Sequence, residues 1–367
     1  MTEKGAILIA AEQLRVLVVR LFVAAGLSPA AARDVAEGLV DADLEGVSSH
    51  GVMLVDMYLG RIRQGSVSTR EAATVVSDRG AAIVLDAGHA LGQLTGEQAV
   101  GMAVERARRL GAGIVAVRHA FHFGTARRYA VKAAAADCIG IVACNTRPLM
   151  PAPGGAERVV GNNPLAIAVP TDGPIPIVLD MATSEAAMGK IRLADKAGEA
   201  IPPNWAVTID GTPTTDPAAA IAGMLLPAAG PKGFGMAFLI DLMCGLLSGG
   251  ASGAAVQPLY GDFAVPYDCS HLFIAIDVAH FADPAAFRVA AAAAADRLRA
   301  GRRAPGVAQL YAPGEIEWRQ RQQAEGHVRL EPAVAAMLVR AARELGVSAE
   351  PLSAPDEAAE DLSRIQA

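Results

Sequence analysis

Residues 81–117 read AAIVLDAGHALGQLTGEQAVGMAVERARRLGAGIVAV, and the spacing of apolar residues along this stretch changes twice. Residues 81–86 have the pattern of a strand, and residues 114–117 form a second short apolar run. Between them, Thr95 and Gln98 have the spacing of a capping box, which predicts the start of a helix. A strand, a helix and a second strand in this order predict a sheet with helical cover.

The residues that follow extend this sheet. Further strands are expected where short apolar runs are bounded by turn residues, and helices where proline or glycine marks a start or a stop. The expected strands are 139–143, 165–169, 175–179 and 272–276, and the expected helices are 125–137, 232–247 and one that starts at Asp283-Pro284.

Both ends of the chain have helical patterns instead. Gly26 stops the first helix, and Ser28 with Pro29 supplies the cap and the first turn of the next. The expected helices are 7–25, 28–44, a third through Tyr58 to Gly65, and 332–345, followed by a loosely held tail, 350–367.

We therefore predict an α/β (mixed α+β) fold with two domains. Residues 1–75 with 286–367 form a discontinuous helical domain, and residues 76–285 form a mixed-sheet domain. At 367 residues the chain exceeds the usual size of a single hydrophobic core, which agrees with this division.

Composition and charge exclude several classes of protein. The net charge is −6 and Lys and Arg are scattered among carboxylates, so there is no basic surface for nucleic acid. Glu12, Arg15 and Arg20 interrupt the first apolar stretch, which excludes a signal peptide, and we expect a cytoplasmic protein without membrane contact. The four cysteines have no CxxC spacing, so we expect buried free thiols instead of disulfides or a zinc site.

Ser49-His50-Gly51 lies in a loop between two expected helices. A histidine with a hydroxyl neighbour and a flexible glycine is able to approach a substrate, and its usual pKa suits proton transfer near neutral pH. On its own the tripeptide also fits an ordinary loop histidine, so this alternative stays open.

A second group of histidines follows the expected strand 114–117. His119 and His122 are three residues apart, between that strand and a helix, where ligand sites of α/β proteins gather. A metal pair is the alternative, but no Asp, Glu or Cys completes a ligand set nearby in the sequence. We therefore predict no metal site.

Lys232 lies where a helix begins, in the segment Gly230-Pro231-Lys232-Gly233-Phe234-Gly235. Free backbone N–H groups and the helix dipole favour an anion at such a position, although a solvated lysine at a helix start is the plain alternative. No GxGxxG follows an expected strand, so the residues alone do not identify a cofactor.

Several segments, taken together and in order, resemble those of one family. They are Ser49-His50-Gly51, His122-Phe123-Gly124, Gly161-Asn162-Asn163-Pro164, Asp180-Met181-Ala182-Thr183-Ser184, Asp210-Gly211 with Thr214-Thr215-Asp216-Pro217, and Pro231-Lys232-Gly233. From about residue 10 to 335 the chain resembles the malate/L-lactate dehydrogenase family of the second type. That family also includes ureidoglycolate, sulfolactate and diketogulonate dehydrogenases and a cyclic-imine-2-carboxylate reductase.

The resemblance implies a non-Rossmann sheet domain that binds NAD or NADP, a homodimer, and a small 2-oxo or 2-hydroxy acid as substrate. On this reading His50 exchanges a proton with the substrate oxygen, Ser49 positions His50, and His122 shares or replaces that role. The residues that match cofactor contacts of the family are Thr146, Asp180, Met181, Ala182, Lys232, Gly233, Pro313, Gly314 and Glu315.

Leu54 departs from the family pattern. Four residues after the loop histidine, many relatives have an arginine that grips the substrate carboxylate, whereas Tyr58, one turn further, is kept. We therefore expect Arg147 or Arg118 to bind the carboxylate, with Tyr58 as a further substrate contact and Leu54 favouring an apolar substrate side chain.

Other functions stay open. One is an NADPH-dependent reductase of cyclic imine or N-alkyl imino acids within the same fold. Another, from a different class, is a non-catalytic dimeric protein that keeps the cofactor pocket. A metal hydrolase that uses His119 and His122 lacks a carboxylate ligand. No motif fixes the preference between NAD and NADP.

Overall fold

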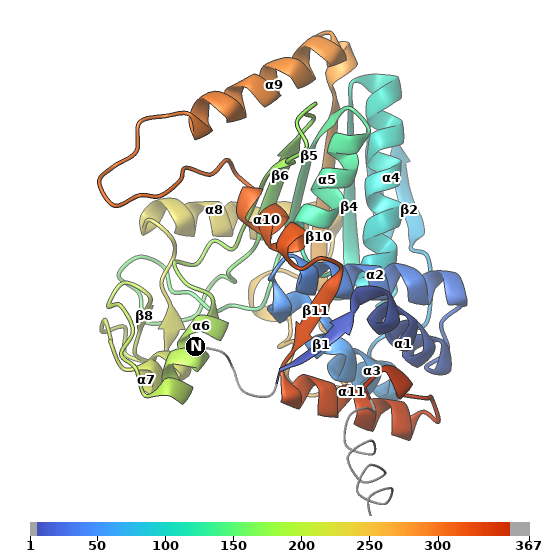
Figure 1. Ribbon diagram of the computed structural model, residues 1–367, viewed down its shortest axis with the longest axis vertical. Coiled ribbons are helices and arrows are strands. Elements are labelled where there is room, and N and C mark those ends of the chain that lie inside the picture. Colours follow the sequence, from blue (N-terminus) through green and yellow to red (C-terminus); the bar gives the residue numbers. More distant parts are fainter. Residues whose placement is uncertain (1–5, 353–367) are drawn as a thin grey trace, which may run out of the picture. The chain divides into compact units, whose positions relative to one another are not determined.

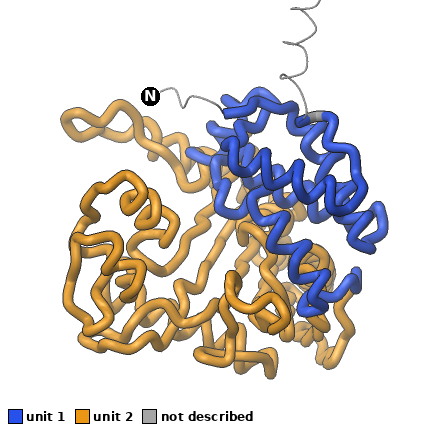
Figure 2. Tube along the Cα trace, turned by 90° about the horizontal axis from the view of Figure 1, so that it is seen from below, with its two compact units in different colours: residues 1–71, 316–367 blue, residues 72–315 orange. Residues whose placement is uncertain are grey.

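The computed structural model describes residues 6–352 (Figure 1). The chain forms two compact units: unit 1 comprises residues 1–71 and 316–367, and unit 2 comprises residues 72–315 (Figure 2). The sequence placed the long helix after Asp283 with the chain ends, whereas this helix belongs to unit 2. Most of the predicted tail, 350–367, lies outside the described residues.

Unit 1 combines helices with a two-stranded antiparallel sheet, in which β1 pairs with β11. The sequence predicted a helix from residue 7, which is wrong for the first four residues because they pair with a strand that is distant in sequence. The elements are β1 (Ile7–Ala10), α1 (Ala11–Ala24), α2 (Pro29–Leu44), α3 (Val55–Gln64), α10 (Glu315–Gln323, whose first residue belongs to unit 2), β11 (His327–Leu330) and α11 (Pro332–Glu344).

The predicted helix boundaries in unit 1 are confirmed where the sequence carries a cap. The Ser28 hydroxyl accepts a hydrogen bond from the N–H of Ala31 at 3.2 Å, and Pro29 is the first residue of α2. Gly65 ends α3 with φ 80°, a conformation that glycine adopts without strain.

Unit 2 is built on a sheet whose described strands run in the order β2-β3-β4-β10-β5-β6-β7. Within residues 72–315, β3 and β4 are the one parallel pair of this sheet, and its other neighbours are antiparallel. This mixed sheet confirms the predicted fold class and differs from the parallel sheet of a Rossmann fold. The strands are β2 (Thr74–Arg79), β3 (Ala82–Asp86), β4 (Ala112–Ala120), β5 (Cys138–Cys144), β6 (Leu165–Val169), β7 (Ile177–Met181) and β10 (Cys269–Asp277).

The helices of unit 2 follow the predicted order, with some short elements that the sequence did not predict. A π-helical turn, Leu242–Leu246, continues α8. The elements are α4 (Gly92–Leu110), α5 (Arg127–Ala135), α6 (Met188–Ala197), β8 (Ala206–Val207), α7 (Pro217–Ala222), β9 (Met224–Leu225), α8 (Pro231–Asp241) and α9 (Pro284–Arg299).

The predicted capping box of α4 is wrong. The helix begins at Gly92, and Thr95 lies buried inside it. The side-chain amide of Gln98 instead exchanges two hydrogen bonds, of 2.7 and 3.1 Å, with the backbone of Ala73. A Cβ at position 92 would lie 2.2 Å from the carbonyl oxygen of Phe121, so the helix start requires glycine.

Alternate residues of the central strands face two different layers. Ala143 and Leu272 pack with Ile240 of α8 on one face. On the other face, Phe273 contacts Tyr129 of α5, with ring centroids 5.5 Å apart. Figure 1 shows α4 and α5 side by side against the sheet. Among the described helices, none is long and apolar enough to cross a membrane.

Candidate active site

His50 lies in a short turn between α2 and α3 of unit 1. The Ser49 hydroxyl is 3.0 Å from Nδ1 of His50. The turn is closed by backbone hydrogen bonds from the N–H of His50 to Val47 and from the N–H of Gly51 to Ser48, both at 2.9 Å. The imidazole is therefore presented by a closed turn and not by a loose loop.

Asp43 holds this turn from the last turns of α2. Its Oδ2 accepts a hydrogen bond from the N–H of Val52 at 2.8 Å. A Cβ on Gly51 would lie 2.1 Å from Oδ1 of Asp43 and 2.3 Å from the carboxyl carbon, so the carboxylate occupies the space beside the glycine. Asp43 was not predicted from the sequence, where the only signal is a carboxylate in the last turn of the helix that leads into the histidine loop.

Both titratable groups of this turn have shifted pKa values. Burial lowers the pKa of His50 to about 4, so the half-buried imidazole is neutral at pH 7. Burial raises the pKa of Asp43 to about 6, against the opposing effect of its hydrogen bonds with Val52 and Ser48. A neutral imidazole is the form that accepts a proton.

Thr146 follows β5 in unit 2 and is held by the Gly161-Asn162-Asn163-Pro164 segment. Its N–H donates to Oδ1 of Asn163 at 2.8 Å, and its hydroxyl donates to Oδ1 of Asn162 at 3.1 Å. A Cβ at Gly161 would lie 2.1 Å from the Thr146 hydroxyl oxygen. The close approach explains why this turn begins with glycine.

Hydrogen bonds and close packing connect Thr146, through Asn162, to two more of the predicted cofactor segments. The N–H of Thr183, directly after Asp180-Met181-Ala182, donates to the carbonyl of Asn162 at 3.2 Å. The carbonyl of Thr183 in turn accepts from the N–H of Ala228 at 2.9 Å. Gly233 packs against the same residue, because a Cβ there would lie 2.1 Å from the Ala228 carbonyl oxygen. Three separate sequence segments thus meet in one hydrogen-bonded group.

Lys232 is exposed in the first turn of α8, where the N–H groups of a helix are not used within the helix. The helix begins with Gly230 at φ 63° and Pro231, as the sequence predicts. An exposed lysine beside such N–H groups forms a place where a phosphate or another anion is favoured.

Asp180 caps a helix in addition to lying on β7. Its Oδ2 accepts a hydrogen bond from the N–H of Arg127, the first residue of α5, at 3.0 Å. Met181 and Ala182 are half-buried beside it. The Asp180 carboxylate therefore has a structural function. Its contact with the cofactor stays a prediction.

Pro313, Gly314 and Glu315 lie at the edge of the sheet. The carbonyl of Pro313 accepts from the N–H of Val178 at 3.1 Å, and Gly314 has φ 84°. Glu315 is fully buried and pairs with Arg299 at 2.7 Å. The Glu315 carboxylate is thus engaged inside the protein.

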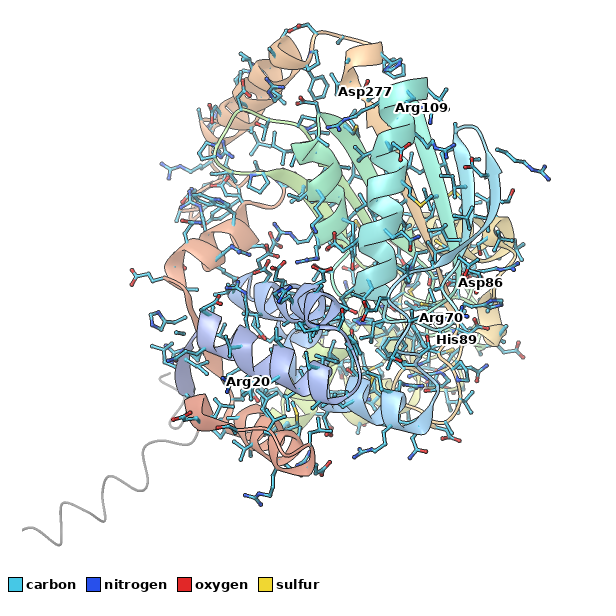
Figure 3. All side chains as sticks on the ribbon, turned by 90° about the vertical axis from the view of Figure 1, so that its right-hand side faces the viewer. Arg20, Arg70, Asp86, His89, Arg109 and Asp277 are labelled. Atoms are coloured by element: carbon cyan, nitrogen blue, oxygen red, sulfur yellow. The ribbon has the colours of Figure 1, made fainter. Side chains whose placement is uncertain are left out.

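Arg118 and His119 both contact one carboxylate. Nε of Arg118 lies 3.1 Å, and Nδ1 of His119 2.9 Å, from Oδ2 of Asp86, the last residue of β3. Figure 3 labels Asp86 together with His89, whose ring centroid is 5.7 Å from that of His119. This carboxylate was not predicted from the sequence because Asp86 precedes His119 by 33 residues.

The remaining predicted residues differ in their surroundings. His122 is half-buried in the segment between β4 and α5. Arg147 is half-buried, and within residues 6–352 its guanidinium has no hydrogen bond or ion pair. Burial and the neighbouring Arg158 and Arg192 lower the pKa of Arg147. Tyr58 is fully buried, with its ring centroid 6.4 Å from that of Phe22, and Leu54 is also buried.

The sequence of residues 9–339 matches the family model described as malate/L-lactate dehydrogenase. The chain is 34% identical to a malate dehydrogenase of Pyrococcus abyssi over 83% of its length and 85% of the relative. It is 36% identical to a ureidoglycolate dehydrogenase (NAD(+)) of Escherichia coli over 84% of this chain and 87% of the relative. It is 35% identical to a (2R)-3-sulfolactate dehydrogenase (NADP(+)) of Chromohalobacter salexigens over 75% and 83%.

Solved structures agree with this match. The sulfolactate dehydrogenase from Methanocaldococcus jannaschii superposes with a TM-score of 0.89 at 33% identity, covering 94% of this chain and 99% of that one. A delta1-piperideine-2-carboxylate reductase from Pseudomonas syringae has a TM-score of 0.80 at 26% identity, covering 91% and 99%. The chain is an oxidoreductase, and it belongs to the malate/L-lactate dehydrogenase family.

Proposed function

We propose that this protein is an NAD(P)-dependent dehydrogenase of a small 2-hydroxy acid, with His50 as the group that exchanges the proton. The observation that carries the proposal is the closed turn of Ser49, His50 and Gly51, fixed by Asp43, in a chain of this family. Relatives named malate, ureidoglycolate and sulfolactate dehydrogenases support the substrate class.

His50 has the protonation state that oxidation of an alcohol requires. With its pKa lowered to about 4, the imidazole is neutral at pH 7 and accepts the hydroxyl proton as the 2-hydroxy acid is oxidised. In the reverse direction His50 returns this proton to the carbonyl oxygen. A substrate carboxylate close to the imidazole raises its pKa in the complex, which assists that direction. Ser49 fixes the ring through Nδ1, and His122 is the second histidine that we propose for the proton step.

Residues of unit 2 suit a nicotinamide dinucleotide. Thr146, the segment Asp180-Met181-Ala182, and Lys232 with Gly233 belong to or adjoin one hydrogen-bonded group, and Lys232 stands at a helix start that favours phosphate. Pro313, Gly314 and Glu315 complete the proposed set at the sheet edge. The nicotinamide, when bound, accepts or donates the hydride. Relatives named with NAD(+) and with NADP(+) leave both cofactors in the proposal.

We assign the substrate carboxylate to Arg147 ahead of Arg118. Arg147 is half-buried without a carboxylate partner among the described residues, whereas Arg118 already pairs with Asp86 at 3.1 Å. An arginine free of a carboxylate inside the protein is available for a bidentate contact with the acid. Tyr58 and Leu54 stay predicted substrate contacts, and Leu54 favours an apolar substrate side chain.

We further propose a homodimer. A row of large apolar side chains is exposed on α8 and the π-helical turn that follows it. In the single chain, Leu239 is 58% exposed and Leu246 is 62% exposed. Met236, Phe238, Met243 and Leu247 continue this row. An apolar surface of this kind is typical of a subunit interface. All four cysteines are buried, as predicted. The cytoplasmic location expected from the sequence stays part of the proposal.

The test follows the absorbance of reduced nicotinamide after the protein is mixed with NADH or NADPH and a 2-oxo acid. Small and bulky acids are compared, each with and without methylamine. Oxidation of the cofactor with the acid alone supports the dehydrogenase and ranks the side chains. Oxidation only with the amine favours the second candidate, an imino acid reductase, to which the likeness to the piperideine-2-carboxylate reductase points. Silence with every acid contradicts the proposal and favours a non-catalytic cofactor-binding protein.

A further inference from the structure

Cys144, Cys269 and His271 meet inside unit 2, and none of the three is assigned to the reaction. One ligand atom from each lies within 4.8 Å of the others. Sγ of Cys269 and Nε2 of His271 are 3.3 Å apart. All three side chains are buried, with Cys269 and His271 at 0% and Cys144 at 4% exposure. Sequence spacing did not reveal the group, because Cys144 is distant from the other two along the chain.

The sheet itself brings the three side chains together. Cys144 ends β5, and its Cα is paired with that of His271 on β10, so the two side chains lie on the same face. Cys269 and His271 are two residues apart on β10, so their side chains also share one face of the sheet. Phe123 stacks on the His271 ring at 4.3 Å and 18°, which fixes the plane of the imidazole.

We propose that Cys144, Cys269 and His271 bind one zinc ion, held inside the sheet of unit 2. Two cysteine sulfurs and a histidine nitrogen are typical zinc ligands, and their mutual spacing fits the 2.0–2.3 Å bonds of roughly tetrahedral zinc. A water or a backbone oxygen takes the fourth position. The prediction of no metal site rested on sequence spacing, which does not see residues that meet across strands.

Charge balance favours the ion over the empty group. Zinc with two thiolates and a neutral imidazole has no net charge, so burying the complex avoids the cost of an unpaired buried charge. Binding replaces the S–H protons of Cys144 and Cys269 by two S–Zn bonds and releases these protons to solvent, with no change of oxidation state.

The ion would stabilise the strand ends that lead into the candidate active site. Asn145 follows Cys144, and its Oδ1 accepts from the N–H of Ser270 at 2.7 Å, between the two other ligands. Thr146 and Arg147 come next in the sequence. We therefore assign the zinc a structural function that is independent of the proposed hydride transfer.

The test measures metal in full-length protein expressed with zinc in the medium and purified with EDTA. The parent protein should retain about one zinc per chain by plasma mass spectrometry, and Cys144→Ser and Cys269→Ser should each retain less than about a tenth of that. Cys138→Ser is the matched control, because Cys138 is equally buried at the other end of β5 and should leave the zinc content unchanged.

A second measurement does not depend on the variants being folded. The parent protein, expressed with cobalt in place of zinc, should show intense thiolate-to-cobalt absorbance together with the visible bands of a tetrahedral site. A folded parent protein without zinc and without these bands would overturn the proposal. An equal zinc content in Cys138→Ser, in the parent and in the Cys144→Ser/Cys269→Ser double variant would also overturn it, as would a Cys144–Cys269 disulfide in the parent under non-reducing mass spectrometry.

Discussion

Gly51→Ala tests whether Asp43 holds the His50 turn. The new Cβ would meet Oδ1, the carboxyl carbon and Oδ2 of Asp43 at 2.1, 2.3 and 2.4 Å, far inside van der Waals contact. The backbone itself tolerates alanine, because φ −90° and ψ −158° lie in the extended region. The carboxyl carbon therefore has to move by about 1.2–1.7 Å to reach the 3.5–4.0 Å at which carbon atoms normally pack.

That movement breaks the 2.8 Å hydrogen bond from Val52 to Asp43. Losing a hydrogen bond to an ionisable group costs about 1.5–3 kcal/mol. The shift relieves the clash but makes the native conformation of the turn less favourable by roughly 2 kcal/mol. This corresponds to a population of that conformation about 30-fold lower. We expect kcat with a 2-hydroxy acid to fall by about 10- to 100-fold, while the Kd of the cofactor stays the same because its proposed contacts lie in unit 2.

The assay combines turnover, followed by nicotinamide absorbance, with cofactor binding and a thermal melt. Gly101→Ala is the control, because it has open space around it in the interior of α4 and should raise stability by about 0.5–1 kcal/mol with unchanged kcat. In an Asp43→Ala background the clash disappears, so adding Gly51→Ala should cost little. Turnover of Gly51→Ala within about twofold of the parent, or an equal loss in both backgrounds, would refute the reasoning.

Three further predictions concern other contacts. Arg147→Ala should raise KM for the acid by about 10- to 100-fold, because it removes the charge-assisted bidentate contact with the substrate carboxylate. Arg118→Ala should raise KM by less, and equal changes in both variants would reject the assignment of the carboxylate to Arg147. As the pH is lowered from 7 to 4, the melting temperature should fall more steeply in Asp43→Asn, and less steeply in His50→Gln, than in the parent. The reason is that the lowered pKa of His50, about 4, makes folding less favourable as pH falls from 6.5, whereas the raised pKa of Asp43, about 6, makes it more favourable; parallel curves would contradict these shifts. Glu315→Ala should lower the free energy of unfolding by about 1.5–3 kcal/mol, because it removes the charge-assisted hydrogen bond from Arg299, which is partly exposed and keeps its pair with Asp296. A loss below about 0.5 kcal/mol in a denaturant titration would show that the Glu315–Arg299 pair contributes little.

Local signals in the sequence predicted those parts of the fold that local chemistry determines. Ser28 with Pro29, Gly65 and Asp283 mark helix ends through their own side chains or backbone, and these boundaries were confirmed. β1 was predicted as helix because its apolar residues continue the pattern of α1, and only pairing with β11 makes it a strand. β2 escaped prediction because it is an edge strand with mostly exposed side chains.

The residues of the candidate site differ in the same way in whether they could be predicted from the sequence. His50 with Ser49, and Lys232 at its helix start, were found because sequence neighbours carry the signal. Asp43 and Asp86 were missed because each acts on a residue that the fold, and not the sequence, places beside it.

The central claim is tested most directly by His50→Ala, with cofactor binding and turnover measured on the same preparation. The proposal predicts a cofactor Kd within about threefold of the parent value, together with a loss of turnover of about 100-fold or more, since a positioned acid or base contributes 10²–10⁴-fold. A His50→Ala variant that turns over like the parent would contradict it, and would move the proton step to His122 or to a group that the proposal does not include.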